Sequence, residues 1–360
     1  MKLLVLAQTP PPLHGQSLMV DALVRGLPLR GIEVVHVQMR LSPTSSDIGR
    51  WRPGKVFTAV RAAMEARRIA RSEKCDALYY VPAPAKRGAL FRDLVVMGLC
   101  RTCVEKLVLH WHAPGLGAWL SGGATSPERI LSMRALGGAD LAIVLAPELE
   151  HDAKALAPRR TAVVPNGIVD SGPYPRHVPG APTEILFLGL GSREKGLRDT
   201  VDAVAILNGR RPGSFRLTFA GSFPEDGEQE YFARRQAELG GSIRHVGFAD
   251  EAQKRELFSS TDIFCLPTYY PNEGQPLAII EALAHDLRIV TTRWRAIPSM
   301  LPPENVWFAE PRQPQGLADT IERAAYAPPA NGAMRRHFLT HFTLEAHLAA
   351  LERALRLIAS

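Results

Sequence analysis

Short runs of aliphatic and β-branched residues alternate with amphipathic stretches along the whole chain, and this alternation limits the folds open to it. In the first half we expect strands near 2–7, 33–39, 76–81, 106–110, 140–145 and 162–165. In the second half we expect them near 184–190, 215–221, 243–247, 262–267, 288–292 and 305–309. Stretches with helical spacing fall between them, including 17–30, 55–74, 126–137, 195–209, 251–259 and 274–285. Because strands that alternate with helices form parallel sheets covered on both faces, the pattern predicts two doubly wound, Rossmann-like α/β domains.

The division between the two domains is expected at a proline-rich stretch. Residues 171–183 hold four prolines and two glycines, a composition typical of a linker. The first domain is therefore predicted over 1–170 and the second over 184–342. The last segment, 343–360, has apolar residues at helical spacing after a threonine, and we expect a helix that can cross back to the first domain.

The positive charge of the chain is concentrated in its first half. Residues 1–170 carry 22 Lys/Arg against 14 Asp/Glu, whereas 171–360 carry 21 against 22. A basic domain indicates either an anionic partner, which would be a membrane surface, a phosphorylated acceptor or nucleic acid, or a surface charge that serves solubility alone. Segment 50–74 interleaves eight cations with apolar residues and is either a lipid-facing helix or an ordinary basic surface helix. No nucleic-acid-reading module is recognisable, so no nucleic-acid partner is expected.

The cellular location and the metal content are predicted from features that the sequence lacks. No run of 18 apolar residues exists, the apolar N-terminal run is too short for a signal peptide, and four cysteines form no disulfide scaffold. We therefore expect a cytoplasmic protein, with a peripheral position at the inner face of the membrane as an open alternative. His110 and His112 lack an obvious third ligand, and Cys100-x2-Cys103 lacks a second pair, so no metal site is expected.

Two motifs of the first half follow predicted strands. The first strand leads through three prolines to Gly15 and Gln16 and then to a helix, an arrangement that presents free backbone N–H groups to an anion. The fourth strand ends in His110-Trp111-His112, and we expect His112, nearer the glycine turn, to face a ligand.

The second half opens with a strand followed by Gly189-x-Gly191. A dinucleotide fingerprint would need a third glycine where Glu194 stands, so an oxidoreductase of that type is not favoured. The loop carries two cations, Arg193 and Lys195, beside a predicted helix N-terminus. Such a pair would hold a diphosphate by charge.

The most informative motif runs from Glu273 to Ala282. A buried strand precedes it, and residues Gly274, Gln275, Pro276 and Leu277 are expected to form a helix N-terminus suited to phosphate. Glu281 lies eight residues after Glu273, about 80° further round a helix. The two carboxylates can therefore meet different parts of one elongated ligand.

In this context Glu-x7-Glu resembles the motif of the retaining glycosyltransferases of the GT-B fold, sequence family four, especially bacterial enzymes of surface-polysaccharide synthesis. Other pieces resemble the family in the family's order: PPPLHGQS, LVLHWHAPG, VVPNGI, REKG and HVGFADEAQKRELFSSTDIFCLPT. The resemblance spans almost the whole chain. It implies two Rossmann-like domains facing across a cleft and transfer of a sugar from a nucleotide-diphosphate sugar, without a metal or other cofactor, to a glycan or lipid-linked acceptor.

The resemblance also implies roles for individual residues. Gly15 and Gln16 would approach the donor diphosphate or the acceptor, and His112 would contact the donor sugar. Lys195 would neutralise the diphosphate. The remaining roles fall on the acidic motif, where Glu273 would bind sugar hydroxyls, Gly274 to Leu277 would supply backbone N–H groups, and Glu281 would bind the nucleotide ribose.

This sequence departs from the family at two places. The family usually has an arginine where Leu190 stands, and Arg193 is a candidate to replace it. The usual glycine pair before Ile297 is replaced by Arg295 and Ala296. Two rival functions therefore stay open: an epimerase or hydrolase acting on nucleotide sugars, and a catalytically degenerate binding protein.

Overall fold

The computed structural model describes residues 1–40, 53–172, 180–328 and 331–359, and these form two compact units. Unit 1 comprises Met1–Gly167 and Leu344–Ser360, and unit 2 comprises Ile168–Thr343. The boundary expected at 170 thus falls after Gly167. The stretch expected as a linker, 171–183, lies within unit 2. Its residues 173–179 are outside the described part of the chain, and its last residue, Thr183, already belongs to a strand.

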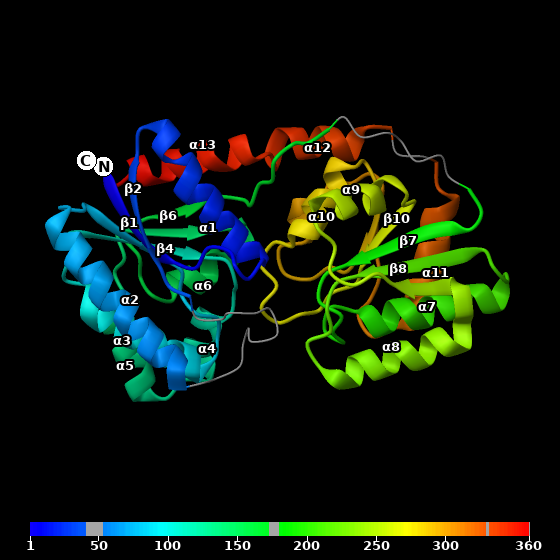
Figure 1. Cartoon of the computed structure of the whole chain (residues 1–360), viewed down its shortest axis with the longest axis horizontal. Helices are drawn as coiled ribbons and strands as arrows, with labels where there is room; N and C mark the ends of the chain where they lie inside the picture. The colour runs from blue at the N-terminus through cyan, green and yellow to red at the C-terminus, as the bar shows by residue number, and fades with distance from the viewer. Residues whose placement is uncertain (41–52, 173–179, 329–330, 360) are drawn as a thin grey trace. The chain divides into compact units, whose positions relative to one another are not determined.

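Unit 1 is built on a parallel six-stranded sheet (Figure 1). Its strands are β1 Lys2–Ala7, β2 Glu33–Gln38, β3 Ala77–Tyr80, β4 Lys106–Trp111, β5 Leu141–Val144 and β6 Thr161–Val163. Its helices are α1 Gly15–Gly26, α2 Pro53–Ser72, α3 Arg87–Cys100, α4 Leu116–Gly122, α5 Ser126–Leu136, α6 Glu150–Lys154 and α13 Leu344–Arg356. The strand order is β2-β1-β3-β4-β5-β6.

The core of unit 1 explains why the last helix joins it. Alternate residues of β1, such as Leu3 and Val5, face a buried cluster that includes Leu23 of α1 and Leu351 and Leu355 of α13. The C-terminal helix therefore supplies part of the hydrophobic layer that covers one face of the first sheet. Helix α2 packs on β1 and β2, and α3 packs between α2 and α5 (Figure 1).

Unit 2 repeats the same architecture with a different strand order. Its strands are β7 Thr183–Leu188, β8 Phe215–Ala220, β9 Ile243–His245, β10 Ile263–Leu266, β11 Arg288–Thr291 and β12 Val306–Phe308. Its helices are α7 Leu197–Arg210, α8 Asp226–Leu239, α9 Glu251–Ser259, α10 Leu277–Ala284, α11 Pro314–Tyr326 and α12 Ala333–His341. The sheet is again parallel, in the order β12-β11-β10-β7-β8-β9.

The strand order fixes where a ligand can reach each unit. In unit 2 the order reverses between β7 and β10, and in unit 1 it reverses between β1 and β3. The loops that leave neighbouring strands at such a point run in opposite directions and leave room beyond the strand ends. The predicted fold class, two Rossmann-like doubly wound domains, is confirmed.

Candidate functional site

The loops after β7 and β10 meet at the point in unit 2 where the strand order reverses. The backbone N–H of Tyr269 donates to the carbonyl of Glu194 at 2.8 Å. Gly196 has a left-handed φ of 86°, and a Cβ placed there would lie 2.5 Å from the carbonyl oxygen of Pro267. Glycine is therefore required at 196 by both conformation and space, and its contact places Lys195 beside the β10 loop.

Lys195 and Glu273 form an ion pair in this place. The ammonium of Lys195 lies 2.6 Å from Glu273 Oε2, and their side chains are 17% and 7% exposed. The Thr268 hydroxyl donates to the same oxygen at 2.9 Å. The ammonium also lies 5.3 Å from the centre of the Tyr270 ring. The structure thus brings together two residues that the sequence predicted as one site from positions 78 residues apart.

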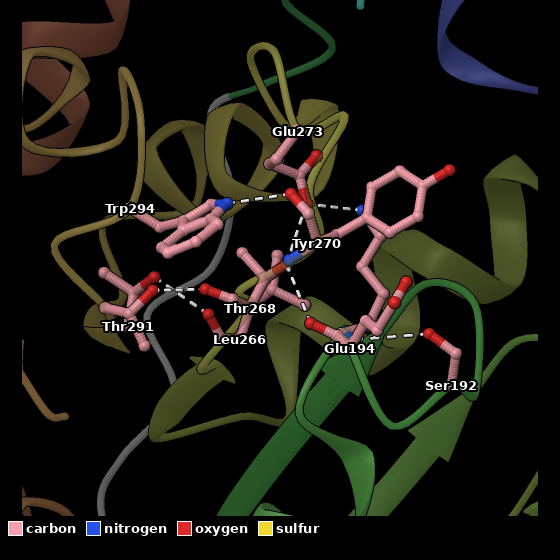
Figure 2. Close-up of polar contacts among 10 residues, drawn as sticks. Ser192, Glu194, Leu266, Thr268, Tyr270, Glu273, Thr291 and Trp294 are labelled. Atoms are coloured by element: carbon pink, nitrogen blue, oxygen red, sulfur yellow. Dashed lines mark hydrogen bonds and ion pairs between the residues drawn. The ribbon is translucent and has the colours of Figure 1, made fainter. Parts of the chain in front are cut away.

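The end of β11 and the loop after it donate hydrogen bonds to the end of β10 and to the loop that carries Glu273 (Figure 2). The Thr291 hydroxyl donates to the Leu266 carbonyl at 2.8 Å, and the indole N–H of Trp294 donates to the Tyr270 carbonyl at 2.8 Å. Thr292 donates in addition to the Thr268 carbonyl. These bonds satisfy backbone carbonyls at the end of β10 and in the loop after it, so the loop that carries Glu273 is held from the β11 side.

The helix after Glu273 begins later than the sequence analysis predicted. Helix α10 starts at Leu277 with Pro276 as its N-cap, so Gly274 and Gln275 lie in the preceding loop. The physical reason is the proline, because it disfavours helical geometry in the residue before it and has no N–H of its own. Of the four residues expected to supply helix N–H groups, Leu277 is the one inside the helix.

Arg193 lies on the exposed side of the β7 loop, where the sequence analysis considered it as a replacement for the arginine absent at Leu190. Leu190 is 42% exposed. Burial raises the pKa of nearby Asp199, and the charges of Arg193 and Arg312 oppose that rise. Arg193 therefore contributes positive charge to this loop. Its role in donor binding stays a prediction.

Arg295 stands where the resembled family usually has a glycine, and its own backbone adopts a conformation that favours glycine. Its φ is 52°, in the left-handed region that costs a residue with a side chain about 1 kcal/mol. Its guanidinium donates to the Pro271 carbonyl at 3.0 Å. The backbone of this loop therefore keeps a conformation that favours glycine although the glycine pair is absent.

Glu281 is engaged in a different ion pair. Its carboxylate lies against the ammonium of Lys254 on α9, and each side chain is 16% exposed. Burial raises the pKa of Glu281, while Lys254 opposes the rise. A ligand hydroxyl bound by Glu281 would have to share the carboxylate with Lys254, so the predicted ribose contact depends on a pair that the sequence analysis did not identify.

The first-domain candidates lie in unit 1 at the carboxyl ends of β1 and β4. Gly15 is exposed and Gln16 half-buried at the start of α1, two residues earlier than the helix start predicted at 17. His14 caps this helix, because its Nδ1 accepts from the Ser17 N–H and its own N–H donates to the Ser17 hydroxyl. This capping box extends the helix to Gly15.

His112 lies in a cluster of three imidazoles, His110, His112 and His347, which we call the histidine cluster. The rings of His110 and His112 are 4.2 Å apart. Within the described residues the Nε2 atoms of all three are buried and lack a hydrogen-bond partner. His110 Nδ1 lies 2.6 Å from the Tyr79 hydroxyl, and His347 Nδ1 donates to the Pro165 carbonyl at 2.6 Å.

Burial in the histidine cluster keeps the imidazole of His112 neutral. Loss of solvation, reinforced by His347 and His14, lowers the pKa of His112 to about 3. A neutral imidazole carries one donor and one acceptor, so His112 can hydrogen-bond a hydroxyl at neutral pH but cannot act as a cation there.

Four residues that contact or support the predicted ones were missed: Thr268, Tyr270, Lys254 and His347. Thr268 and Tyr270 closely precede the acidic motif in the sequence, and this proximity was the signal that could have identified them. Lys254 and His347 are distant in sequence from their partners, so no spacing in the chain could have identified them.

Two absences within the described residues bear on the site. Among the residues outside the gaps at 41–52, 173–179, 329–330 and 360, no three His, Cys, Asp or Glu side chains are grouped so as to hold a metal ion. Within the same ranges, no helix combines the length and apolarity needed to cross a bilayer.

The comparison with sequence families matches residues 182–325, which form most of unit 2, to the glycosyl transferases group 1. A similar curated protein is the putative teichuronic acid biosynthesis glycosyltransferase TuaC of Bacillus subtilis, 26% identical over 201 residues. That match covers 53% of this chain and 48% of TuaC. The chain thus spans about half the length of this relative.

Solved structures match over nearly the whole chain. Sucrose-phosphate synthase from Thermosynechococcus elongatus superposes with a TM-score of 0.77 at 17% identity and 99% coverage of both chains. Anabaena Alr3699/HepE in complex with UDP-glucose gives 0.67 at 16% identity, covering 99% of this chain and 100% of that one. Residues 182–325 of unit 2 thus match the glycosyl transferases group 1, and the solved structures show that both units share the fold of these proteins.

Proposed function

We propose that this chain is a retaining, metal-independent glycosyltransferase that moves a hexose from a nucleotide-diphosphate sugar to a glycan or lipid-linked acceptor in surface-polysaccharide synthesis. The observation that carries the proposal is the Lys195–Glu273 pair at the point where the strand order of unit 2 reverses. Two similar proteins support this donor class and this kind of product, because HepE was solved in complex with UDP-glucose and TuaC is named for teichuronic acid biosynthesis.

The reaction breaks the bond between the anomeric carbon of the donor and the terminal phosphate oxygen, and that oxygen keeps the electron pair. The acceptor hydroxyl oxygen forms the new bond on the same face of the sugar. Its proton passes to the departing phosphate oxygen, so the products are the glycosylated acceptor and the nucleotide diphosphate. Negative charge therefore develops on the leaving group, and a fixed cation near that oxygen would lower the barrier.

Lys195 is the residue proposed to stabilise the negative charge that develops on the leaving phosphate oxygen. Its ammonium is held by Glu273 and lies near the Tyr270 ring, so it is positioned before a ligand arrives. Arg193 and the N–H groups at the start of α10 add positive potential at the same loop ends. Glu273 is proposed to accept from sugar hydroxyls while it orients Lys195. Glu281 is proposed to accept from the ribose.

Unit 1 is proposed to bind the acceptor, and Gly15 and Gln16 at the start of α1 are proposed to approach the donor diphosphate or the acceptor. His112 is proposed to hydrogen-bond the donor sugar. Because burial holds the pKa of His112 at about 3, the imidazole acts as a neutral hydrogen-bonding group rather than as an acid. A lipid-linked acceptor would place the protein at the inner face of the membrane.

The first test is a thermal-shift screen with UDP-, GDP- and ADP-sugars in the presence of EDTA. A donor at about 100 times its dissociation constant adds about 2.7 kcal/mol of stability. We expect one nucleotide class to raise Tm with EDTA present. A shift that requires a divalent cation would reject metal independence.

The donor found in that screen then enters a transfer assay with a panel of glycan and lipid-linked acceptors. Transfer with retention of the anomeric configuration supports the proposal. Acceptor-independent conversion of the donor would identify an epimerase or hydrolase. Donor binding without transfer to any acceptor would identify a degenerate binding protein, the alternative that Leu190 favours.

A further inference from the structure

The carboxylate of Asp152, on α6 of unit 1, is buried and has no part in the proposed chemistry. Asp152 is 1% exposed. Its Oδ2 accepts the backbone N–H of Gly115 at 3.0 Å, and its Oδ1 accepts the backbone N–H of Ala118 at 3.1 Å. Because a buried carboxylate is costly unless hydrogen bonds compensate it, these two N–H groups offset the cost of the burial of Asp152.

Both N–H groups belong to the segment that directly follows His112. We call residues 112–115 the β4 loop, because they connect β4 to α4. At one end of this loop, Trp111 is buried as the last residue of β4, where β4 pairs with β5. At the other end, Gly115 is the N-cap of α4 and has a left-handed φ of 114°. His112 therefore lies between the end of a paired strand and a point that Asp152 holds.

The backbones of α4 and α6 also touch at this place. The two helices pack against each other (Figure 1). A Cβ placed at Gly117 would lie 2.1 Å from the carbonyl oxygen of Asp152 and 2.9 Å from the Cβ of Ala155. Glycine at 117 therefore lets the first turn of α4 lie directly on α6, within reach of both oxygens of the Asp152 carboxylate.

The residue type at 152 suits this double contact. A carboxylate presents an acceptor at each of its two oxygens, so it can hold two backbone N–H groups at once. Asparagine has one acceptor oxygen, and its NH2 group would face the second N–H. A carboxylate at this position therefore fixes two points of the segment after His112, whereas an amide of the same shape would fix one.

We propose that Asp152 is a positioning residue that fixes the β4 loop and, through it, the imidazole of His112. The effect on turnover rests on the proposed function, in which His112 hydrogen-bonds the donor sugar. A reacting geometry that is displaced by about 1 Å can lose about 100-fold in rate. Loss of one of the two anchors after His112 should therefore reduce transfer although Asp152 contacts neither substrate in this proposal.

The first test is a double-mutant cycle that combines Asp152→Asn with His112→Ala. Steady-state transfer is measured for the wild type, both single variants and the double variant, below the lowest Tm of the set. We expect Asp152→Asn to lower kcat by about tenfold or more in the wild-type background. In the His112→Ala background the same change should lower kcat by about twofold at most, because the side chain that it positions is absent.

The matched control is Asp140→Asn, at the opposite end of β4. Asp140 is also a largely buried carboxylate, 13% exposed, that accepts a backbone N–H, from Leu107 at 2.8 Å, while its other oxygen pairs with Arg159 at 3.0 Å. We expect both Asp→Asn variants to lower Tm. The control should keep kcat within about twofold of the wild type, and its effect should add to that of His112→Ala.

A binding measurement separates the sugar contact from the nucleotide contacts. In calorimetry, Asp152→Asn should weaken the nucleotide sugar by about three- to tenfold, the usual effect of one misplaced neutral hydrogen bond. The affinity for the free nucleotide diphosphate should stay within about twofold, because unit 2 is proposed to bind it. A role in stability alone would leave the ratio of these two affinities unchanged.

Hydrogen exchange without any ligand tests the anchoring itself. Peptides that cover residues 112–120 should exchange about tenfold faster in Asp152→Asn than in the wild type, whereas peptides over β3 should be unchanged. If Asp152→Asn does not fold, Asp152→Ser replaces it, because serine brings no NH2 group against the two backbone N–H groups.

Four results would overturn the proposal: unchanged kcat in Asp152→Asn, an undiminished loss in the His112→Ala background, an equal loss of kcat in Asp140→Asn, or unchanged exchange of residues 112–120. A wild-type chain that transfers sugar to no acceptor would instead reject the proposed function. In that case the hydrogen-exchange result decides by itself whether Asp152 holds the β4 loop.

Discussion

Replacement of Lys195 by alanine tests both the packing and the chemistry of the β7 and β10 loops. The carboxylate of Glu273 is 7% exposed and its ion pair with Lys195 is 2.6 Å long. Removal of one partner from a largely buried pair costs about 3 kcal/mol, because the remaining charge keeps its desolvation penalty. For a unit of this size, 1 kcal/mol shifts Tm by about 2–4 °C. Lys195→Ala should therefore lower Tm by about 6–12 °C.

The same substitution should lower turnover by about 100-fold or more, the usual effect of removing one group that stabilises developing negative charge. The assay is donor consumption at saturating donor, below the Tm of the variant. The control is Lys195→Ala/Glu273→Gln, which removes the stranded charge. It should recover part of the lost Tm without recovering turnover. Unchanged turnover in Lys195→Ala, or recovered turnover in the double variant, would refute the leaving-group role.

Gly196→Ala should destabilise unit 2 by at least about 2 kcal/mol, because alanine disfavours the left-handed φ and its Cβ would clash, whereas Gly209→Ala on open helix α7 should be neutral or stabilising in the same thermal melt. Arg193→Ala should weaken donor binding by about 10- to 100-fold in calorimetry, as expected for a lost charged hydrogen bond, and Leu190→Arg should restore it; no loss would show that Arg193 does not replace the missing arginine. Burial lowers the pKa values of the imidazoles in the histidine cluster, so below about pH 6.5 the unfolded chain binds protons there that the folded chain does not bind. The free energy of unfolding should therefore fall as the pH drops below about 6.5, by up to about 1.4 kcal/mol per pH unit for each imidazole. In urea unfolding between pH 7 and 5.5, His347→Gln should reduce that slope, and an unchanged slope would contradict the assignment.

The sequence was sufficient for the fold because its strongest signals are local. All twelve expected strands are present, within two residues of their predicted ends, since each is a short aliphatic run between polar turns. Helix α9 has the predicted bounds, and Asp250 caps it. Helix α10 starts three residues later than predicted, because Pro276 governs the backbone of the residues before it.

The site was predictable only where its residues lie in ordered motifs. Lys195 and Glu273 follow two strands that become neighbours through the order of the sheet, and their direct ion pair could not be read from spacing. The Lys254–Glu281 pair and the place of His347 depend on how α9 and α13 pack. Such contacts arise from tertiary structure, and the chain gives no local sign of them.

Donor binding as proposed depends on fixed cations and backbone amides of the β7 and β10 loops that hold the pyrophosphate. The most direct measurement is a crystal structure of the chain soaked, in EDTA, with the nucleotide sugar that gives the largest thermal shift. Pyrophosphate oxygens should lie within hydrogen-bond distance of Lys195 Nζ and of N–H groups at the start of α10. A pyrophosphate bound away from these loops would contradict this mode of binding.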